Sequence, residues 1–240
     1  MDQIISEFKS LHLTGMAEQW KIMTETRTAG TTTLRDGISL LIQAENDRRR
    51  NNRTARLIKN ARFRYSASME QVACDPARGV DKQTVNTLAS CQWIRDGTSV
   101  LVTGASGVGK SYLATALGYQ ACLMGYRVQY YNMSKLMEAV KMARIEACVP
   151  KFFERMAEAD LVIIDDFGMR KLDGQQLLDF MEILEDRHGR KSTIIASQLP
   201  VVDWYEIMEK NKTVADAVMD RLAKTAYRFE LKGESLRKKY

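Results

Sequence analysis

Residues 104–111 read Gly-Ala-Ser-Gly-Val-Gly-Lys-Ser, which matches the phosphate-loop pattern G-x-x-x-x-G-K-[ST]. An apolar run at residues 99–103 precedes the loop, and a helix-like segment follows it. Glycines let the backbone curl around an anion, and the helix N-terminus adds a favourable dipole. We therefore expect a nucleoside triphosphate to bind here, whereas an ordinary glycine turn is disfavoured by this context. The predicted contacts are Gly104, Ala105, Ser106, Gly107, Val108, Gly109, Lys110, Ser111 and Tyr112.

Four side chains are candidates for the chemistry of hydrolysis. Lys110 is expected to reach the β- and γ-phosphates, and the Ser111 hydroxyl to bind Mg²⁺. Residues 161–166, Leu-Val-Ile-Ile-Asp-Asp, form an apolar strand that ends in two carboxylates. Asp165 is predicted to hold the Mg²⁺ shell, and Asp166 to orient or deprotonate the attacking water. Two acids that merely cap a loop are the alternative, which the upstream phosphate loop disfavours.

Four further residues are candidates for sensing the nucleotide. Strand 193–197 ends in Ser197-Gln198, and either residue faces the γ-phosphate if this strand lies between the two already described. Arg221 lies in a helical segment with an apolar face, and Arg237 lies in the C-terminal Gly-Glu-Ser-Leu-Arg. An arginine that reaches a γ-phosphate speeds hydrolysis by orders of magnitude, but a single arginine is more commonly solvated at the surface.

The composition is that of a globular protein with 240 residues, three prolines and a formal charge of +6. Such a length suits one well-cored domain and a smaller appendage. No apolar stretch approaches a membrane span, and the N-terminus lacks the features of a signal peptide. The four cysteines are scattered without a C-x-x-C pair, so neither a zinc site nor a disulfide framework is indicated. We expect a cytoplasmic protein with reduced thiols and no membrane partner.

Positive charge is concentrated between Arg48 and Arg64, where no acidic residue occurs. Such a run suits a polyanion, because neutralised phosphates release condensed counterions. The alternative is a solvated helix face that pairs with acids elsewhere in the chain. The candidate DNA contacts are Arg48, Arg49, Arg53, Arg56 and Lys59.

The chain divides into three parts by its periodicity. Residues 1–65 follow helical periodicity and predict a small bundle of three or four helices, residues 66–98 form a connector, and residues 99–240 alternate between strands and helices. Alternation of this kind predicts an α/β fold with a central parallel sheet covered on both faces. The predicted strands are 100–103, 128–132, 161–165, 193–197 and 227–231. The predicted helices between them are 110–124, 134–147, 151–159, 175–188 and 214–224.

Taken together, the motifs GASGVGKS, LVIIDDFG, IIASQLP followed by Trp204, ADAVMDRL and GESLRK resemble the IstB-like AAA+ ATPases. These are helper proteins encoded by bacterial insertion sequences beside their transposase, and are relatives of the helicase loader DnaC. The resemblance covers essentially the whole chain. It includes the N-terminal segments Leu-His-Leu-Thr-Gly-Met at residues 11–16 and Ala-Glu-Asn-Asp-Arg-Arg-Arg at residues 44–50.

The resemblance implies a P-loop AAA+ domain preceded by a small all-α domain, with ATP and Mg²⁺ as cofactors. Arg221 matches the arginine finger, which acts on the nucleotide of a neighbouring subunit, and Arg237 matches the second sensor arginine. The family forms ATP-dependent homo-oligomers on double-stranded DNA, which they bend and offer to the cognate transposase. The chain departs from most AAA+ proteins in three ways. Asp166 replaces the more usual glutamate, Gln198 stands where asparagine is common in the sensor position, and the helical lid is absent or vestigial.

The expected function is therefore a DNA-binding ATPase of transposition, in which ATP builds the oligomer and hydrolysis disassembles it. A DnaC-like helicase loader shares every ATPase motif and is the main alternative. A small-molecule kinase, which needs an acceptor pocket and usually an arginine-rich lid, is the third possibility. The strand between the phosphate-loop strand and the Asp165 strand, together with the DRL and GES-x-R motifs, disfavours it. A nucleotide binder without turnover remains open if Asp166 is a poor base.

Overall fold

The computed structural model describes residues 3–208 and 211–236. It divides into two compact units, Met1–Arg56 and Leu57–Tyr240, which are described separately. The division falls within the long helix α3 (Leu34–Ala61). Residues after the division, among them Leu57 and Ile58 in the last turns of α3 and Phe63 beyond it, pack into the core of the second unit. The helical region predicted for residues 1–65 is therefore shared between the two units.

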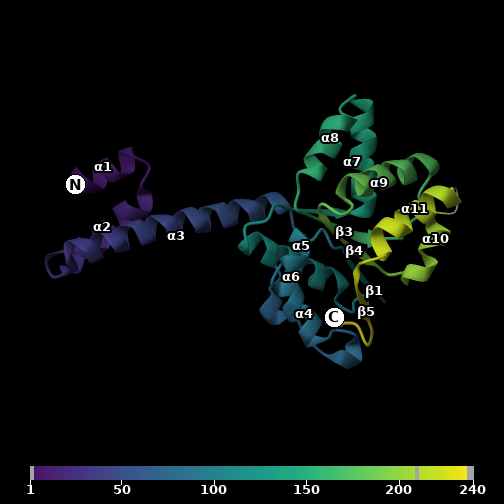
Figure 1. Ribbon diagram of the computed structural model, residues 1–240, viewed down its shortest axis with the longest axis horizontal. Helices are drawn as coiled ribbons and strands as arrows, with labels where there is room; N and C mark the ends of the chain where they lie inside the picture. The colour runs from purple at the N-terminus through teal and green to yellow at the C-terminus, as the bar shows by residue number, and fades with distance from the viewer. Residues whose placement is uncertain (1–2, 209–210, 237–240) are drawn as a thin grey trace. The chain divides into compact units, whose positions relative to one another are not determined.

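The first unit consists of α1 (Gln3–Ser10), α2 (Thr14–Glu25), a short 3-10 turn at Thr28–Gly30 and the first part of α3 (Figure 1). Its α2 packs closely on α3 at Gly15. A Cβ at this position would lie 2.7 Å from both the carbonyl oxygen of Ala44 and the Cα of Glu45, so only glycine permits the approach. The Glu45 carboxylate accepts the Gly15 N–H over 2.7 Å and the Met16 N–H over 3.4 Å. It thus satisfies two N–H groups at the start of α2 that the helix itself cannot.

The second unit is built on a five-stranded parallel sheet in the order β2-β3-β4-β1-β5. The strands are β1 (Val100–Gly104), β2 (Val128–Asn132), β3 (Leu161–Phe167), β4 (Ser192–Ser197) and β5 (Tyr227–Leu231). All five predicted strands are confirmed, with differences of one or two residues at their ends. The α/β fold with a central parallel sheet and an N-terminal helical part is confirmed as well.

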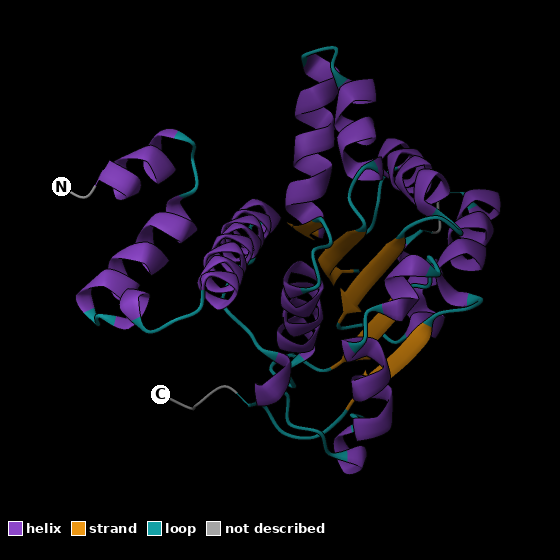
Figure 2. Cartoon of the chain, turned by 60° about the vertical axis from the view of Figure 1, so that its left-hand side comes forward, coloured by secondary structure: helices purple, strands orange, loops and turns teal. Residues whose placement is uncertain are grey.

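Helices cover both faces of this sheet (Figure 2). Side chains of neighbouring positions alternate between the two cores, as Leu101 and Val102 of β1 do. One core holds α7 (Met133–Ile145), α8 (Val149–Ala157), α9 (Gly174–Arg187), α10 (Trp204–Ile207) and α11 (Lys212–Ala223). The other holds α4 (Lys82–Ala89), α5 (Gln92–Arg95), α6 (Lys110–Leu123) and the end of α3. Apolar residues on both faces explain the near-continuous apolar strands of the sequence.

The strand order decides where the site forms. Because β4 lies between β1 and β3, the segments that follow these three strands meet at the same edge of the sheet. The phosphate loop follows β1, Asp165 and Asp166 lie near the carboxyl end of β3, and Ser197-Gln198 lie at the end of β4. None of the described helices combines the length and apolar character needed to cross a membrane.

Candidate nucleotide-binding site

The phosphate loop connects the end of β1 to the first turn of α6. Gly109 is the residue before α6 and has φ of 105°, a left-handed conformation that favours glycine. Gly107 also has positive φ, and a Cβ there would lie 2.2 Å from the Ser235 hydroxyl oxygen. Glycine at these positions keeps the loop open toward a bound anion, and the first N–H groups of α6 point to the same space.

Lys110 and Ser111 begin α6 and face the other parts of the site. The Lys110 ammonium donates to the carbonyl oxygen of Ala105 over 2.7 Å, so it folds back over the loop. The Ser111 hydroxyl donates to Asp165 Oδ1 over 3.0 Å. This bond joins the phosphate loop to the end of β3, and brings together the two residues predicted to hold Mg²⁺.

Asp165 is buried and its carboxylate is held from three directions. Besides Ser111, the Asp166 N–H donates to Oδ1 over 2.9 Å, and the Tyr130 hydroxyl donates to Oδ2 over 2.5 Å. Burial, followed by the hydrogen bond to Asp165, raises the pKa of Tyr130 well above its usual value. Its hydroxyl therefore keeps the proton that it donates.

Asp166 adopts φ of 57°, so its side chain leaves the strand in a different direction from that of Asp165. Its Oδ2 accepts from Asn132 Nδ2 over 2.8 Å. Asn132 also caps α7, because its Oδ1 accepts from the Ser134 and Lys135 N–H groups. The two adjacent carboxylates thus have different surroundings.

The oxygen donors of Ser111 and Asp165 fit Mg²⁺, which is usually held by one or two protein oxygens together with phosphate oxygens and water. The described part of the chain holds no cluster of three or more His, Cys, Asp or Glu side chains suited to a metal. The residues present therefore fit a metal that arrives with its nucleotide and do not form an all-protein cage.

Ser197 and Gln198 have different surroundings at the end of β4. The buried Ser197 hydroxyl donates to the Phe167 carbonyl oxygen over 2.8 Å and accepts the Leu199 N–H over 3.0 Å. Gln198 is exposed and lines the same cavity as the phosphate loop, with its Nε2 3.2 Å from Met169 Sδ. Gln198 is thus the residue of the pair that faces the nucleotide space.

That cavity has a volume of about 590 Å³, which suits a nucleotide. Residues of the connector and the two residues just before it form one of its walls, although the sequence motifs do not mark them: Arg64, Tyr65, Gln71, Val72, Ala73, Arg78 and Val80. The Tyr112 hydroxyl donates to Gln71 Oε1 over 2.8 Å. The rings of Tyr65 and Tyr112 are nearly parallel, with centroids 6.3 Å apart. The wall therefore combines aromatic and apolar side chains with the polar groups of Arg64, Gln71 and Arg78.

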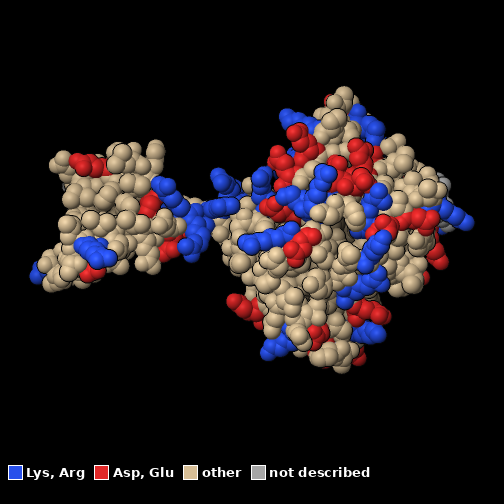
Figure 3. Space-filling model, in the orientation of Figure 1, with Lys and Arg blue, Asp and Glu red and all other residues tan. Residues whose placement is uncertain are grey.

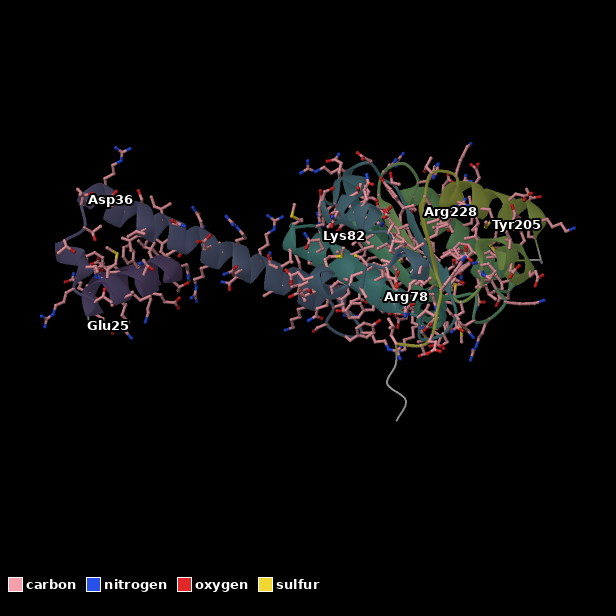
Figure 4. All side chains as sticks on the ribbon, turned by 90° about the horizontal axis from the view of Figure 1, so that it is seen from below. Glu25, Asp36, Arg78, Lys82, Tyr205 and Arg228 are labelled. Carbon is pink, nitrogen blue, oxygen red and sulfur yellow. The ribbon has the colours of Figure 1, made fainter. Side chains whose placement is uncertain are left out.

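The segment after β5 lies against the phosphate loop. The Leu236 N–H donates to the Gly107 carbonyl oxygen over 2.9 Å. Arg78, labelled in Figure 4, holds this segment through a bond from Nη2 to the Glu234 carbonyl oxygen over 3.2 Å, and its own carbonyl accepts the Lys232 N–H. Arg237, the predicted second sensor, lies outside the described residues.

Arg221 lies away from the phosphate loop of its own chain. Its guanidinium pairs with the Glu185 carboxylate and donates to the Ala217 carbonyl oxygen over 3.0 Å. It lines a second cavity together with Ser99 and Thr193, at the amino ends of β1 and β4. The phosphate loop follows the carboxyl end of β1, and a strand of that length spans roughly 16 Å. The structure therefore does not bring Arg221 together with the other predicted site residues.

The predicted DNA contacts lie along α3, where basic atoms gather on the face shown in Figure 3. Three arginines of the run have acidic partners: Arg48 pairs with Glu18, Arg49 with Glu45, and Arg50 with Asp47. The expectation of a run without compensating acids is therefore wrong for its first turn, because Glu18 reaches it from α2 and Glu45 and Asp47 lie one turn earlier. Arg53, Arg56 and Lys59 are exposed. Within the described residues, Arg56 and Lys59 form no ion pair.

The family model described as "IstB-like ATP binding protein" matches residues 6–240. The chain belongs to this family. It is 36% identical over 234 residues to the insertion sequence ATP-binding protein y4pL of Sinorhizobium fredii, covering 98% of this chain and 95% of the relative. It is 28% identical over 240 residues to the insertion sequence IS21 ATP-binding protein of Pseudomonas aeruginosa, covering 100% and 89%.

Solved structures share the fold of this IstB-like chain. The crystal structure of the DnaC helicase loader matches with a TM-score of 0.58 at 18% identity, over 69% of this chain and 97% of that one. The AMPPCP-bound DnaA of Aquifex aeolicus matches with the same TM-score at 16% identity, over 72% and 53%. At these identities the likeness concerns the fold alone.

Two residues that contact the carboxylates went unnoticed in the sequence of this IstB-like chain. Tyr130 and Asn132 lie two positions apart on β2 and bind Asp165 and Asp166, respectively. The period of a strand places both side chains on the same face. The available signal was Asn132, a polar residue at the end of a half-buried strand. The sequence alone does not show that β3, with its two carboxylates, is the strand beside β2.

Proposed function

We propose that this chain is a Mg²⁺-dependent ATPase that assembles on duplex DNA in its ATP-bound state and serves transposition. One observation carries the proposal: the residues suited to hydrolysis fall into two sets. The phosphate loop, Asp165, Asp166 and Gln198 gather at the carboxyl edge of the sheet, and Arg221 lies at the amino edge. Membership of a family named for ATP binding, with relatives named after insertion sequences, supports it.

Within the pocket, each side chain takes a role that follows from its position. Lys110 exchanges its bond to the Ala105 carbonyl for the β- and γ-phosphates, and Ser111 and Asp165 hold the metal, which neutralises charge on the phosphate oxygens. Asp166 orients the attacking water and accepts its proton. Gln198 contacts the γ-phosphate or the water from the neighbouring strand.

Arg221 completes the site of a neighbouring subunit. Since it lies at the other edge of the sheet, it supplies charge to a γ-phosphate only when the amino edge of one subunit docks on the carboxyl edge of the next. A head-to-tail contact of this kind is heterologous and builds rings or helical filaments. Arg221 must then leave Glu185 for the phosphate, so assembly and hydrolysis are coupled.

The basic side chains of α3 supply contacts to DNA phosphates. Arg56 and Lys59 are the better candidates, because they are exposed, whereas Arg48 and Arg49 are engaged by Glu18 and Glu45. Contacts to phosphates give affinity without base specificity, and their repetition along an oligomer offsets the few kcal/mol needed to bend DNA. The transposase encoded beside such a protein is the proposed partner of the complex.

Sedimentation with long duplex DNA tests this function. We expect large complexes only when ATP and duplex DNA are both present, and expect Arg221→Ala to abolish them or to abolish hydrolysis within them. Lys224→Ala is the matched control, because Lys224 follows the same helix and pairs with Asp220 at an exposed position. Complexes that form equally without nucleotide would contradict the proposal.

The DnaC-like helicase loader is the second candidate, since a DnaC structure shares this fold. A loader is expected to remain small on duplex DNA and to bind single strands. The same sedimentation experiment with single-stranded DNA of equal length separates the two functions.

A further inference from the structure

Strand β2 contributes a side chain to the metal side of the nucleotide site. In the register of β2 with β3, Asn132 pairs with Asp165, and Tyr130 pairs with Ile163. Tyr130 therefore lies two residues before the carboxylate, and its long side chain runs along the sheet until the hydroxyl reaches Asp165 Oδ2 at 2.5 Å. No sequence motif of the nucleotide site includes this strand.

The bond matters because of how Asp165 is surrounded. Only 1% of the residue is exposed, so water has little access to its carboxylate. Oδ1 accepts from Ser111 and from the Asp166 N–H, whereas within the described part of the chain Oδ2 accepts from Tyr130. Loss of the tyrosine hydroxyl leaves a buried carboxylate oxygen short of a donor, which is costly and allows the group to turn.

The Tyr130 ring is itself supported. Phe63, just beyond the end of α3, meets it edge to face with centroids 6.4 Å apart and an interplanar angle of 69°. Phe63 in turn lies over Gly118 of α6, where a Cβ would come within 2.8 Å of Phe63 Cε1. Such edge-to-face contact adds stability beyond burial and fixes the ring orientation. The Phe63 ring, which α6 supports at Gly118, thus helps to fix the direction of the Tyr130 hydroxyl.

We propose that Tyr130 is a positioning residue that orients the Asp165 carboxylate toward Mg²⁺, and that Phe63 holds the Tyr130 ring for this purpose. The proposal rests on the proposed function, because it assumes that Asp165 belongs to the metal shell. Partners of this kind, which contact a metal ligand and not the metal, commonly change metal affinity or activity 10- to 100-fold when removed.

The chain supplies a matched control in the next residue. Tyr131 is also half-buried on β2, but it points to the opposite face, where its hydroxyl donates to Gln129 Oε1 over 2.9 Å. Tyr130→Phe and Tyr131→Phe remove the same atom from adjacent positions. Only the first substitution removes a donor from Asp165.

The test is a Mg²⁺ titration of the binding of a fluorescent N-methylanthraniloyl-ATP to the full chain. We expect Tyr130→Phe to raise the Mg²⁺ concentration at half-saturation about tenfold, with metal-free nucleotide affinity close to wild type. The melting temperature should fall modestly, because a buried carboxylate oxygen loses its donor. Tyr131→Phe should leave the Mg²⁺ titration unchanged. Phe63→Leu keeps an apolar side chain but loses the ring contact. It should also raise the Mg²⁺ concentration at half-saturation, by a smaller factor than Tyr130→Phe.

The outcomes separate this inference from the function on which it rests. A Tyr130→Phe titration that coincides with wild type overturns the positioning role, and equal losses with and without Mg²⁺ do so too, because they indicate a general structural effect. A Phe63→Leu titration identical to wild type overturns the role of Phe63. Wild-type binding that is indifferent to Mg²⁺ contradicts the proposed function instead.

Discussion

The backbone N–H of Leu236 donates to the carbonyl oxygen of Gly107, so the segment that follows β5 is bonded to the middle of the phosphate loop. Ser235 packs over Gly107 in the same place, and Arg78 holds the segment from the connector. Three parts of the chain that are distant in sequence therefore meet at the phosphate loop. Substitutions at this contact are therefore expected to change the affinity for the nucleotide.

Gly107→Ala should weaken ATP binding about tenfold or more, because it combines strain at positive φ with a collision against Ser235. Equilibrium binding of the fluorescent ATP analogue measures the effect. Gly174→Ala is the control, since Gly174 has open space around its Cβ position and no positive φ. Unchanged ATP binding by Gly107→Ala would contradict this prediction, because it would show that the segment at Ser235 moves aside at little cost.

Ser197→Ala and Gln198→Ala should separate stability from hydrolysis. Ser197→Ala removes both bonds of a buried hydroxyl, so we expect the free energy of unfolding to fall by about 1–3 kcal/mol. Gln198→Ala should leave unfolding by urea unchanged and reduce ATP turnover, because its side chain faces the cavity. The reverse pattern would assign the sensing role to Ser197.

The first unit should lose stability in acid through Glu45. Burial by itself raises the pKa of this carboxyl, but hydrogen bonds from Arg49, Gly15 and Met16 outweigh it, so the pKa lies below the ordinary 4.5. A carboxyl with a lowered pKa in the folded state contributes stability above its unfolded pKa, and that contribution is lost as the pH falls through the folded pKa.

Hydrogen exchange in the peptide covering α2 measures this loss. In wild type, protection should decrease as the pH falls below about 4.5, the ordinary value, after correction for the intrinsic exchange rate. Glu45→Gln should be less protected at neutral pH and should lack this pH dependence. An identical acid profile in both proteins would rule out Glu45 as the titrating group.

The sequence predicts the sheet well because β1, β3 and β4 are buried on both faces and are bounded by clear turn residues. It predicts the phosphate loop and Asp165 because their motifs have fixed spacing. Ion pairs between residues far apart in sequence cannot be predicted in this way. Glu18 lies 30 residues from Arg48, and no local pattern links the two. The same limit applies to Tyr130, whose role depends on β2 being the neighbour of β3.

Burial also distinguishes residues that look alike in sequence. Ser197 and Gln198 are both polar and adjacent, and only the direction of each side chain separates a structural hydroxyl from a group that faces the cavity. Arg187 ends α9, Arg221 lies in the last turn of α11, and both line the second cavity. Arg187 is fully buried and donates to the carbonyl oxygens of Met156 and Ala159, which a helical pattern does not reveal.

A mixing experiment tests most directly the central claim that Arg221 acts on a neighbour's nucleotide. Asp166→Asn and Arg221→Ala should each bind ATP but hydrolyse it poorly on duplex DNA. In an equal mixture, the Arg221 of one variant meets the intact Asp166 of the other at about a quarter of randomly formed head-to-tail contacts, so we expect about a quarter of the wild-type rate. A mixture no more active than its two components would contradict the account.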